Sequence, residues 1–230
     1  NDIHSVAIMP CTAKKYEAQK VEMTRKGLPD IDTVLTTREF VRMIRMHGID
    51  MAHLNPEPAD EPLGGMSSSG RLSGVSGGAL ESLLRTLHYT MTGREPSSYR
   101  INKLRSNRIV KEVSVRMGEK EITGAAVSGI GNALQLLKSE ASGKKKYDII
   151  EIMACPGGCV NGGGQPINRD EAAIRNRVRA IYDLDNMDLI KAAHKNPQLI
   201  DFHKKLEEEK SLTKYREEWK QAFTFTGKSV

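Results

Sequence analysis

The chain has 230 residues, 38% hydrophobic and 28% charged, which is typical of a globular protein with a sizeable core. Its apolar runs are too short to cross a membrane and no signal-peptide pattern occurs, so we expect a cytoplasmic protein without membrane insertion. The net charge is +6, but only 5% of residues are aromatic and no nucleic-acid-binding motif occurs, so we exclude nucleic acid as a partner. We expect a mixed solvated surface, or docking to an acidic partner, in one large or two small domains.

The three cysteines do not suggest a disulfide framework, because Cys11 lies far in sequence from Cys155 and Cys159. A reducing compartment is the simpler interpretation. The chain begins at Asn1 rather than at a methionine, and a strand follows almost at once. We therefore expect a piece of a longer protein or one chain of a split protein.

The first cysteine follows a predicted strand. The run from His4 to Met9 is mostly apolar and is typical of a buried strand. Pro10 and Cys11 come next, so the thiol is expected at an edge of the sheet, where sites of α/β folds gather. Lys14 follows within reach of whatever Cys11 binds. Lysines are usually solvated, but a position beside a cysteine loop makes this one a candidate site residue.

The middle of the chain predicts alternating strands and helices. Residues 31–35 are expected to form a strand, and Thr36 or Thr37 to cap a helix that ends near Gly48. Residues 56–69, rich in proline, glycine and serine, are expected to form a long loop. The later elements are expected to be a helix at 79–91, paired strands at 108–117 and 120–128, a helix at 129–137 and a strand at 147–153.

The glycine-rich segment from Gly70 to Gly78 precedes the helix at 79–91, with Ser76 as a candidate cap. A glycine-rich turn at a helix start can bind an anion. The segment has neither the P-loop lysine pattern nor a full GxGxxG, so a nucleotide site is weakly supported. We favour close approach of its backbone to a buried group.

The stretch Glu151-Ile-Met-Ala-Cys-Pro-Gly-Gly-Cys-Val-Asn-Gly-Gly-Gly-Gln-Pro166 carries the other two cysteines. Pro156 suits the first turn of a helix, which would place Cys155 at the N-cap and Cys159 one turn later on the same face. The positive end of a helix stabilises thiolates, and glycines let backbone N–H groups approach a bulky cluster. Buried cysteines and glycine loops also occur without metal, but a core needs no glycine-wrapped cysteine pair.

Both cysteine segments follow an apolar strand ending in Met-x-Cys, at Met9 and Met153. We therefore predict an α/β fold with two lobes of small mixed β-sheets flanked by helices around one buried metal cluster. The highly charged helical pattern from Arg169 to Lys220 predicts a helical C-terminal extension.

Cysteine ligands favour a soft metal, and the residues alone leave two kinds of metal open. Structural zinc accepts a Cys-x3-Cys pair, although it seldom needs triple glycine or neighbouring methionines. An iron–sulfur cluster needs four ligands, and the chain has three cysteines. The fourth ligand would come from another segment or chain.

The segments Met9-Pro-Cys-Thr-Ala-Lys14 and Glu151 to Pro166 closely resemble the second and third signatures of [FeFe]-hydrogenases. The resemblance runs from about Ser5 to about Tyr182. It implies that residues 1–168 are the C-terminal part of an H-cluster domain, without the family's first signature. It implies more loosely that residues 169–230 are a small-subunit-like extension.

The resemblance implies an H-cluster, which is a [4Fe-4S] cube joined to a two-iron subcluster with CO, cyanide and a bridging dithiolate. Cys11 and Cys155 would ligate the cube, Cys159 would bridge to the two-iron subcluster, and Lys14 would donate to a cyanide. The remaining residues of the implied pocket are its walls: Met9, Pro10, Gly74 and Met153. The implied activity is reversible interconversion of H2 with protons and electrons.

Two departures from the family keep further functions open. The missing first signature would supply the fourth cube ligand, so we expect a further segment or partner chain, and an electron partner that is ferredoxin-like or NAD-linked. Ser73 stands where the family usually has phenylalanine, which would suit a hydrogen sensor. An iron–sulfur assembly or electron-transfer protein with little turnover also stays open, and so does a zinc-stapled interaction domain.

Overall fold

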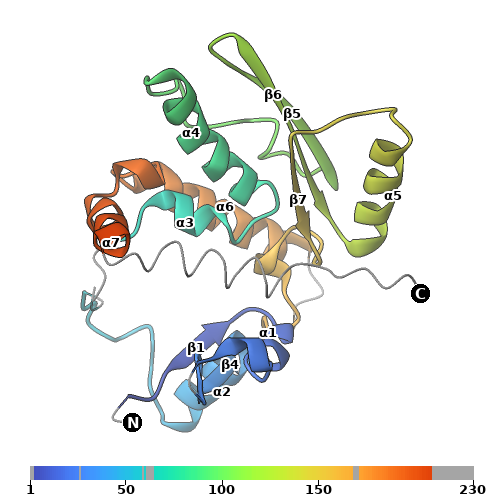
Figure 1. The fold of residues 1–230 in the computed structure, drawn as a ribbon. Helices are drawn as coiled ribbons and strands as arrows, with labels where there is room; N and C mark the ends of the chain where they lie inside the picture. Colours follow the sequence, from blue (N-terminus) through green and yellow to red (C-terminus); the bar gives the residue numbers. More distant parts are fainter. Residues whose placement is uncertain (1–2, 26, 59, 61–64, 168–170, 209–230) are drawn as a thin grey trace.

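The computed structural model describes residues 3–25, 27–58, 60, 65–167 and 171–208, which form two lobes joined by loops (Figure 1). The N-terminal lobe holds a parallel pair of strands, β1 (Val6–Met9) and β4 (Thr33–Thr36), with Met9 opposite Thr36. Helices α1 (Ala13–Glu17) and α2 (Thr37–Met46) follow these strands. A small antiparallel pair, β2 (Thr24–Arg25) and β3 (Leu28–Pro29), follows the 3-10 turn η1 (Val21–Met23).

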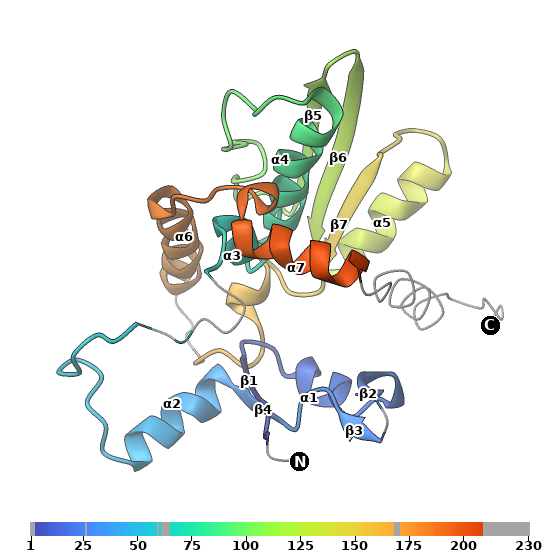
Figure 2. The same ribbon diagram turned by 60° about the vertical axis from the view of Figure 1, so that its left-hand side comes forward.

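The second lobe is built on a mixed sheet in the order β5-β6-β7. Strands β5 (Val110–Met117) and β6 (Lys120–Ser128) are antiparallel, and β7 (Ile149–Met153) lies parallel to β6. Helix α4 (Gly78–Thr92) and helix α5 (Ile130–Ala141) cover this sheet (Figure 2). Alternate residues of β6 belong to two core clusters, so this central strand is buried on both faces.

The C-terminal helices pack against the second lobe. Helix α6 (Glu171–Met187) lies beside the short helix α3 (Ser68–Leu72), and the 3-10 turn η3 (Ala193–Lys195) leads into α7 (Pro197–Glu208). Asp185 of α6 is 3% exposed and ion-pairs with two arginines of the lobe, Arg85 and Arg105. Glu81 of α4 pairs with the same two arginines. This buried quartet of two acids and two bases fastens α6 to α4.

Several sequence predictions are confirmed. The α/β class, the strands ending at Met9 and Met153, the β5–β6 pair and the helices at α2, α4 and α5 all form. The predicted burial of the first strand is wrong, because Val6 is 52% and Ile8 46% exposed. The loop predicted at 56–69 lacks helix and strand until α3 in the described part of that range. The predicted helical segment beyond residue 208 lies outside the described residues, and the domain division at residue 168 stays a prediction. Within the described residues, no helix is long and apolar enough to cross a membrane.

Two predicted helix caps have different outcomes. Ser76 does not cap α4, because the N-cap is Gly77, which adopts φ +87°. Thr36 does cap α2: its hydroxyl accepts from the backbone N–H of Glu39, and the Glu39 carboxylate accepts from the backbone N–H of Thr36. This reciprocal pair is a capping box. The Thr36 hydrogen bonds and Lys15 hold the pKa of Glu39 at about 2.

The capping box gives a prediction for the stability of the N-terminal lobe. Thr36→Ala should lower the free energy of unfolding by about 1 kcal/mol, because the first turn of α2 loses its side-chain acceptor. Thr37→Ala is the matched control, since Thr37 is the first residue of α2 and caps nothing. Urea unfolding followed by circular dichroism measures both. Equal losses in the two variants would show that the cap contributes nothing.

Candidate metal centre

Three loops meet between the lobes. They are the segment after β1, the α3–α4 turn, and the cysteine loop, by which we mean residues 154–166 after β7. The backbone N–H of Gly164 donates to the carbonyl of Pro10 (2.9 Å), and that of Val160 donates to Gly74 (3.1 Å). The N–H of Ser76 donates to Gly157 (3.0 Å). The cysteine loop therefore binds both other loops through main-chain hydrogen bonds.

The glycines of the cysteine loop are needed for this close approach. A Cβ on Gly162 would lie 2.1 Å from the carbonyl oxygen of Pro10, and one on Gly158 would lie 2.7 Å from the backbone nitrogen of Ser76. A Cβ on Gly164 would lie 2.9 Å from the Cβ of Thr36. Real side chains do not approach so closely, so only glycine lets the loops pack in this way. These glycines are therefore needed for contact between the loops, and the approach of their backbone to a metal cluster stays a prediction.

The predicted helix starting at Pro156 is wrong. Gly157 and Gly158 adopt φ +80° and +104°, which end any right-handed helix after Pro156. The only helical turn of the loop is the 3-10 turn η2 (Cys159–Asn161), so Cys159 begins a helical turn rather than continuing one. Pro156 favours a helix start, but Gly157 and Gly158 both have positive φ values that residues with side chains rarely adopt, so no helix forms.

The thiol of Cys159 is under the electrostatic influence of the other two cysteines. Cys11 and Cys155 are partly buried, and Cys159 is exposed as a whole residue. Partial desolvation raises the pKa of the Cys159 thiol, and the charges of Cys11 and Cys155 raise it further, while Lys14 lowers it. The Gly164–Pro10 hydrogen bond holds the two distant segments that carry these cysteines against each other.

Lys14 lies on α1, where its ammonium group is 2.6 Å from a carboxylate oxygen of Glu17. Met9 and Met153 end their strands half-buried, and Gly74 accepts the hydrogen bond from Val160. Ser73 is exposed, and its hydroxyl donates to the carbonyl of Gly70 (2.6 Å).

Glu151 is a positioning residue that the sequence patterns did not single out. Its carboxylate accepts from the backbone N–H groups of Gly77 (2.6 Å) and Leu80 (2.8 Å), at the first turn of α4. The strand that carries the cysteine loop is thereby fixed to the glycine turn. A carboxylate inside the otherwise apolar run Ile149–Met153 was the available signal, since a partly buried carboxylate needs hydrogen-bond donors.

Arg38 is a second residue that the sequence patterns did not reveal. Its backbone N–H donates to the carbonyl of Gly164 (2.9 Å), and its guanidinium donates to the carbonyl of Gly163 (3.1 Å). The start of α2 therefore holds the triple-glycine run from the side opposite the second lobe.

The donor set fits an iron–sulfur cluster. Thiolates are the ligands of such clusters, and the glycine loop lets main chain surround a bulky inorganic group. Within the described residues, no three His, Cys, Asp or Glu side chains are arranged to hold a single metal ion.

The chain belongs to the iron-only hydrogenase family: the family described as "Iron only hydrogenase large subunit, C-terminal domain" matches residues 1–163. It is 37% identical over 201 residues to the NADP-reducing hydrogenase subunit HndD of Solidesulfovibrio fructosivorans, covering 87% of this chain and 34% of that protein. It is 41% identical over 165 residues to the periplasmic [Fe] hydrogenase large subunit of Nitratidesulfovibrio vulgaris, covering 72% of this chain and 39% of that protein.

Two further comparisons bear on fold and activity. An apo [FeFe]-hydrogenase variant from Chlamydomonas reinhardtii superposes with a TM-score of 0.73 at 30% identity, covering 88% of this chain and 58% of that one. The mouse cytosolic iron-sulfur assembly component 3 is 34% identical over 169 residues, covering 71% of this chain and 35% of that protein. The chain thus spans between 34% and 39% of the length of these three curated relatives, and hydrogenases and assembly proteins are both similar to it.

Proposed function

We propose that this chain is part of a hydrogenase that interconverts H2 with protons and electrons at an H-cluster. The main-chain contact of Gly164 with Pro10, which holds the loop of Cys155 and Cys159 against the segment of Cys11 and Lys14, is the observation that supports this proposal most. When bound, the cluster would supply electron relay from the cube and hydride chemistry from the two-iron subcluster.

In this proposal each residue has a separate role. Cys11 and Cys155 would hold the cube, and Cys159 would link it to the two-iron subcluster. Lys14 would donate to a cyanide of the subcluster, and its three donors would then be divided between that ligand and Glu17. Met9, Pro10, Gly74 and Met153 would exclude water around the group. A further segment or chain supplies the fourth cube ligand, and a ferredoxin-like or NAD-linked partner exchanges electrons.

A second candidate function uses the same cysteines without hydrogen turnover. The similarity to the mouse assembly component supports an iron–sulfur assembly or electron-transfer role, and the exposed hydroxyl of Ser73 suits a hydrogen sensor. Cellular location stays a prediction, because the names of the relatives include periplasmic and cytosolic proteins.

Infrared spectroscopy separates these functions. The chain is matured anaerobically with the segment that supplies the fourth cysteine, and the metal-bound CO and cyanide region is recorded together with iron and sulfide content. The proposal predicts CO and cyanide bands. Iron and sulfide without those bands would favour the assembly or electron-transfer role, and zinc without iron would exclude both.

A substitution at Lys14 tests the role of its ammonium group. Lys14→Met should lower the retained two-iron subcluster and H2 turnover about tenfold or more while the cube remains, because a charge-assisted hydrogen bond to the group is lost. Lys20→Met is the matched control, since Lys20 is an exposed lysine close by in the same segment. Equal infrared spectra and turnover in the two variants would contradict the assignment.

A further inference from the structure

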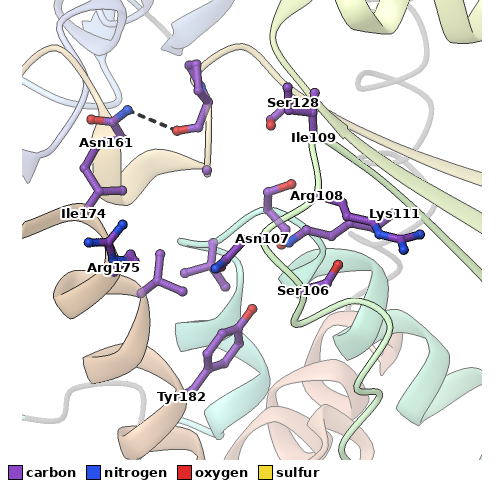
Figure 3. Close-up of a pocket in the computed structure, with 15 residues that line it drawn as sticks. Ser106, Asn107, Arg108, Ile109, Lys111, Ser128, Asn161, Ile174, Arg175 and Tyr182 are labelled. Carbon is purple, nitrogen blue, oxygen red and sulfur yellow. Dashed lines mark hydrogen bonds between the residues drawn. The ribbon is translucent and has the colours of Figure 1, made fainter. Parts of the chain in front are cut away.

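A cavity of about 350 Å³ lies against the cysteine loop, and none of the three cysteines lines it. Figure 3 shows that its walls come from the segment leading into β5, from α6 and from the cysteine loop. The α3–α4 turn contributes Val75 and Ser76. The cavity is therefore a separate space on the second lobe, next to the proposed metal centre.

One end of the cavity holds a buried cation with unused donors. Lys111 of β5 is 6% exposed, and its ammonium group donates to the carbonyl of Ser76 (2.5 Å). An ammonium group has three donors, and the described residues offer Lys111 no other acceptor and no carboxylate partner. Burial lowers the pKa of Lys111, while the charges of Glu151 and Glu81 act in the opposite direction.

Two buried serines line the cavity together with this lysine. Ser76 is 2% exposed, and its hydroxyl oxygen has no hydrogen-bond partner among the described residues. Ser128 is 3% exposed and also lines the cavity. A buried hydroxyl without a partner costs free energy, so its presence at a cavity wall points to a ligand that supplies the partner.

The electrostatics of the lining favour an anion. Arg108 lines the cavity together with Lys111, and none of the described lining residues is acidic. Glu151, the carboxylate that acts most strongly on Lys111, already accepts from two backbone N–H groups of α4. The described walls of the cavity therefore offer Lys111 no carboxylate partner of their own.

The rest of the cavity is apolar. Its apolar side chains come from three elements: Val75, Ile109, Ile174, Val178 and the ring of Tyr182. A hydrated inorganic anion would make no apolar contacts with these side chains. An anionic group on an apolar body would place its charge at Lys111 and its apolar part against α6.

We infer that this cavity binds a carboxylate carried on an apolar body, with Lys111 and the hydroxyls of Ser76 and Ser128 as its donors. The carboxylate could belong to a free organic acid or to a glutamate side chain in an apolar polypeptide segment. The inference concerns a ligand site that does not depend on the cysteines, so it stands or fails separately from the proposed hydrogenase function.

Calorimetric titration of the full chain with benzoate tests the inference. Benzamide serves as the uncharged probe of the same shape, and inorganic phosphate as the anion without an apolar body. We expect benzoate to bind at least tenfold more tightly than either. If benzamide binds as tightly as benzoate, the site does not recognise the negative charge. If phosphate binds more tightly than benzoate, the apolar side chains do not contribute to affinity. Either result, or no binding of benzoate, would overturn the inference.

Two variants locate the binding to the inferred donors. Lys111→Met should weaken benzoate binding about tenfold or more, because the buried charge-assisted donor is removed. Ser76→Ala should weaken it a few-fold without loss of thermal stability, since the hydroxyl has no partner in the protein. Lys120→Met and Ser114→Ala, both exposed on the same hairpin, are the controls. Unchanged affinity in Lys111→Met and Ser76→Ala would place the probe elsewhere and refute the site.

The two sources of the carboxylate are distinguished with a blocked hexapeptide that has one glutamate among apolar residues. Tighter binding of the peptide than of benzoate indicates a polypeptide ligand, and the reverse indicates a free acid. Either result supports the site only if Lys111→Met abolishes the difference in affinity between the peptide and benzoate. A difference in affinity that persists in Lys111→Met would contradict the inferred site.

Discussion

Gly162→Ala is expected to separate the cysteine loop from the Cys11 loop, whereas Gly163→Ala is expected to be tolerated. A Cβ at Gly162 would lie 2.1 Å from the Pro10 carbonyl oxygen, which is backbone and cannot move aside cheaply. A Cβ at Gly163 would meet the Thr12 hydroxyl at 3.4 Å, which is ordinary contact. Overpacking of this kind costs about 1–3 kcal/mol or more. We therefore expect a loss of that size for Gly162→Ala in urea unfolding.

The same pair of variants tests the metal centre. Cys11 and Cys155 reach one cluster only if the two loops stay in contact, so iron retained after anaerobic reconstitution should fall severalfold in Gly162→Ala. Gly163→Ala should retain iron like the parent chain, because neither glycine has a positive φ and only their surroundings differ. Equal iron contents in the two variants would show that this contact is not needed for cluster binding.

Asp185→Asn should lower the free energy of unfolding by roughly 3–5 kcal/mol at neutral pH. The substitution leaves the buried guanidinium of Arg85 with one carboxylate fewer, and breaking a buried ion pair on one side has a cost of this size. Asp183→Asn is the control on the same helix, since the Arg179–Asp183 pair is exposed and 3.7 Å apart. We expect less than about 1 kcal/mol for the control. Similar losses in both variants would contradict the importance of the buried quartet.

The pH dependence of this loss follows from the Asp185 carboxyl. Burial would raise its pKa, but hydrogen bonds from Arg85, Ser68 and Arg105 outweigh burial and hold the pKa well below its usual range. A depressed pKa stabilises the native state above the usual carboxyl pKa of about 3.9, and this stabilisation is lost as pH falls below that value. The difference in free energy of unfolding between the parent chain and Asp185→Asn should therefore shrink as the pH falls from about 5 to about 3. A constant difference would refute this explanation.

Local sequence signals predicted the elements that depend on neighbouring residues. The apolar runs before Cys11 and Cys155 form β1 and β7, and Thr36 caps α2 as its sequence suggests. The cysteine loop was predicted as a metal-binding segment from its residue types, yet its local structure was predicted wrongly. A proline after Cys155 indicates a helix start, but the conformation of Gly157 and Gly158 is set by contacts with the α3–α4 turn.

The long-range contacts that position the site could not be predicted from local sequence patterns. Glu151 anchors the first turn of α4, and Asp185 joins two arginines far from it in sequence. Charged residues in an amphipathic helix such as α6 are usually solvated, so nothing local indicated a buried aspartate there. These contacts depend on which elements the fold brings together, and that is decided by tertiary packing.

The hydrogen bond between Gly164 and Pro10 has a consequence for the order of folding. Residues 10 and 164 are far apart in the sequence, so closing this contact carries a large loop entropy that earlier contacts must offset. The second lobe has mostly shorter-range contacts, such as the β5–β6 hairpin, and is expected to fold first. The N-terminal lobe then joins a preformed cysteine loop. A newly synthesised chain therefore cannot present all three thiols to iron until its glycine run has emerged from the ribosome.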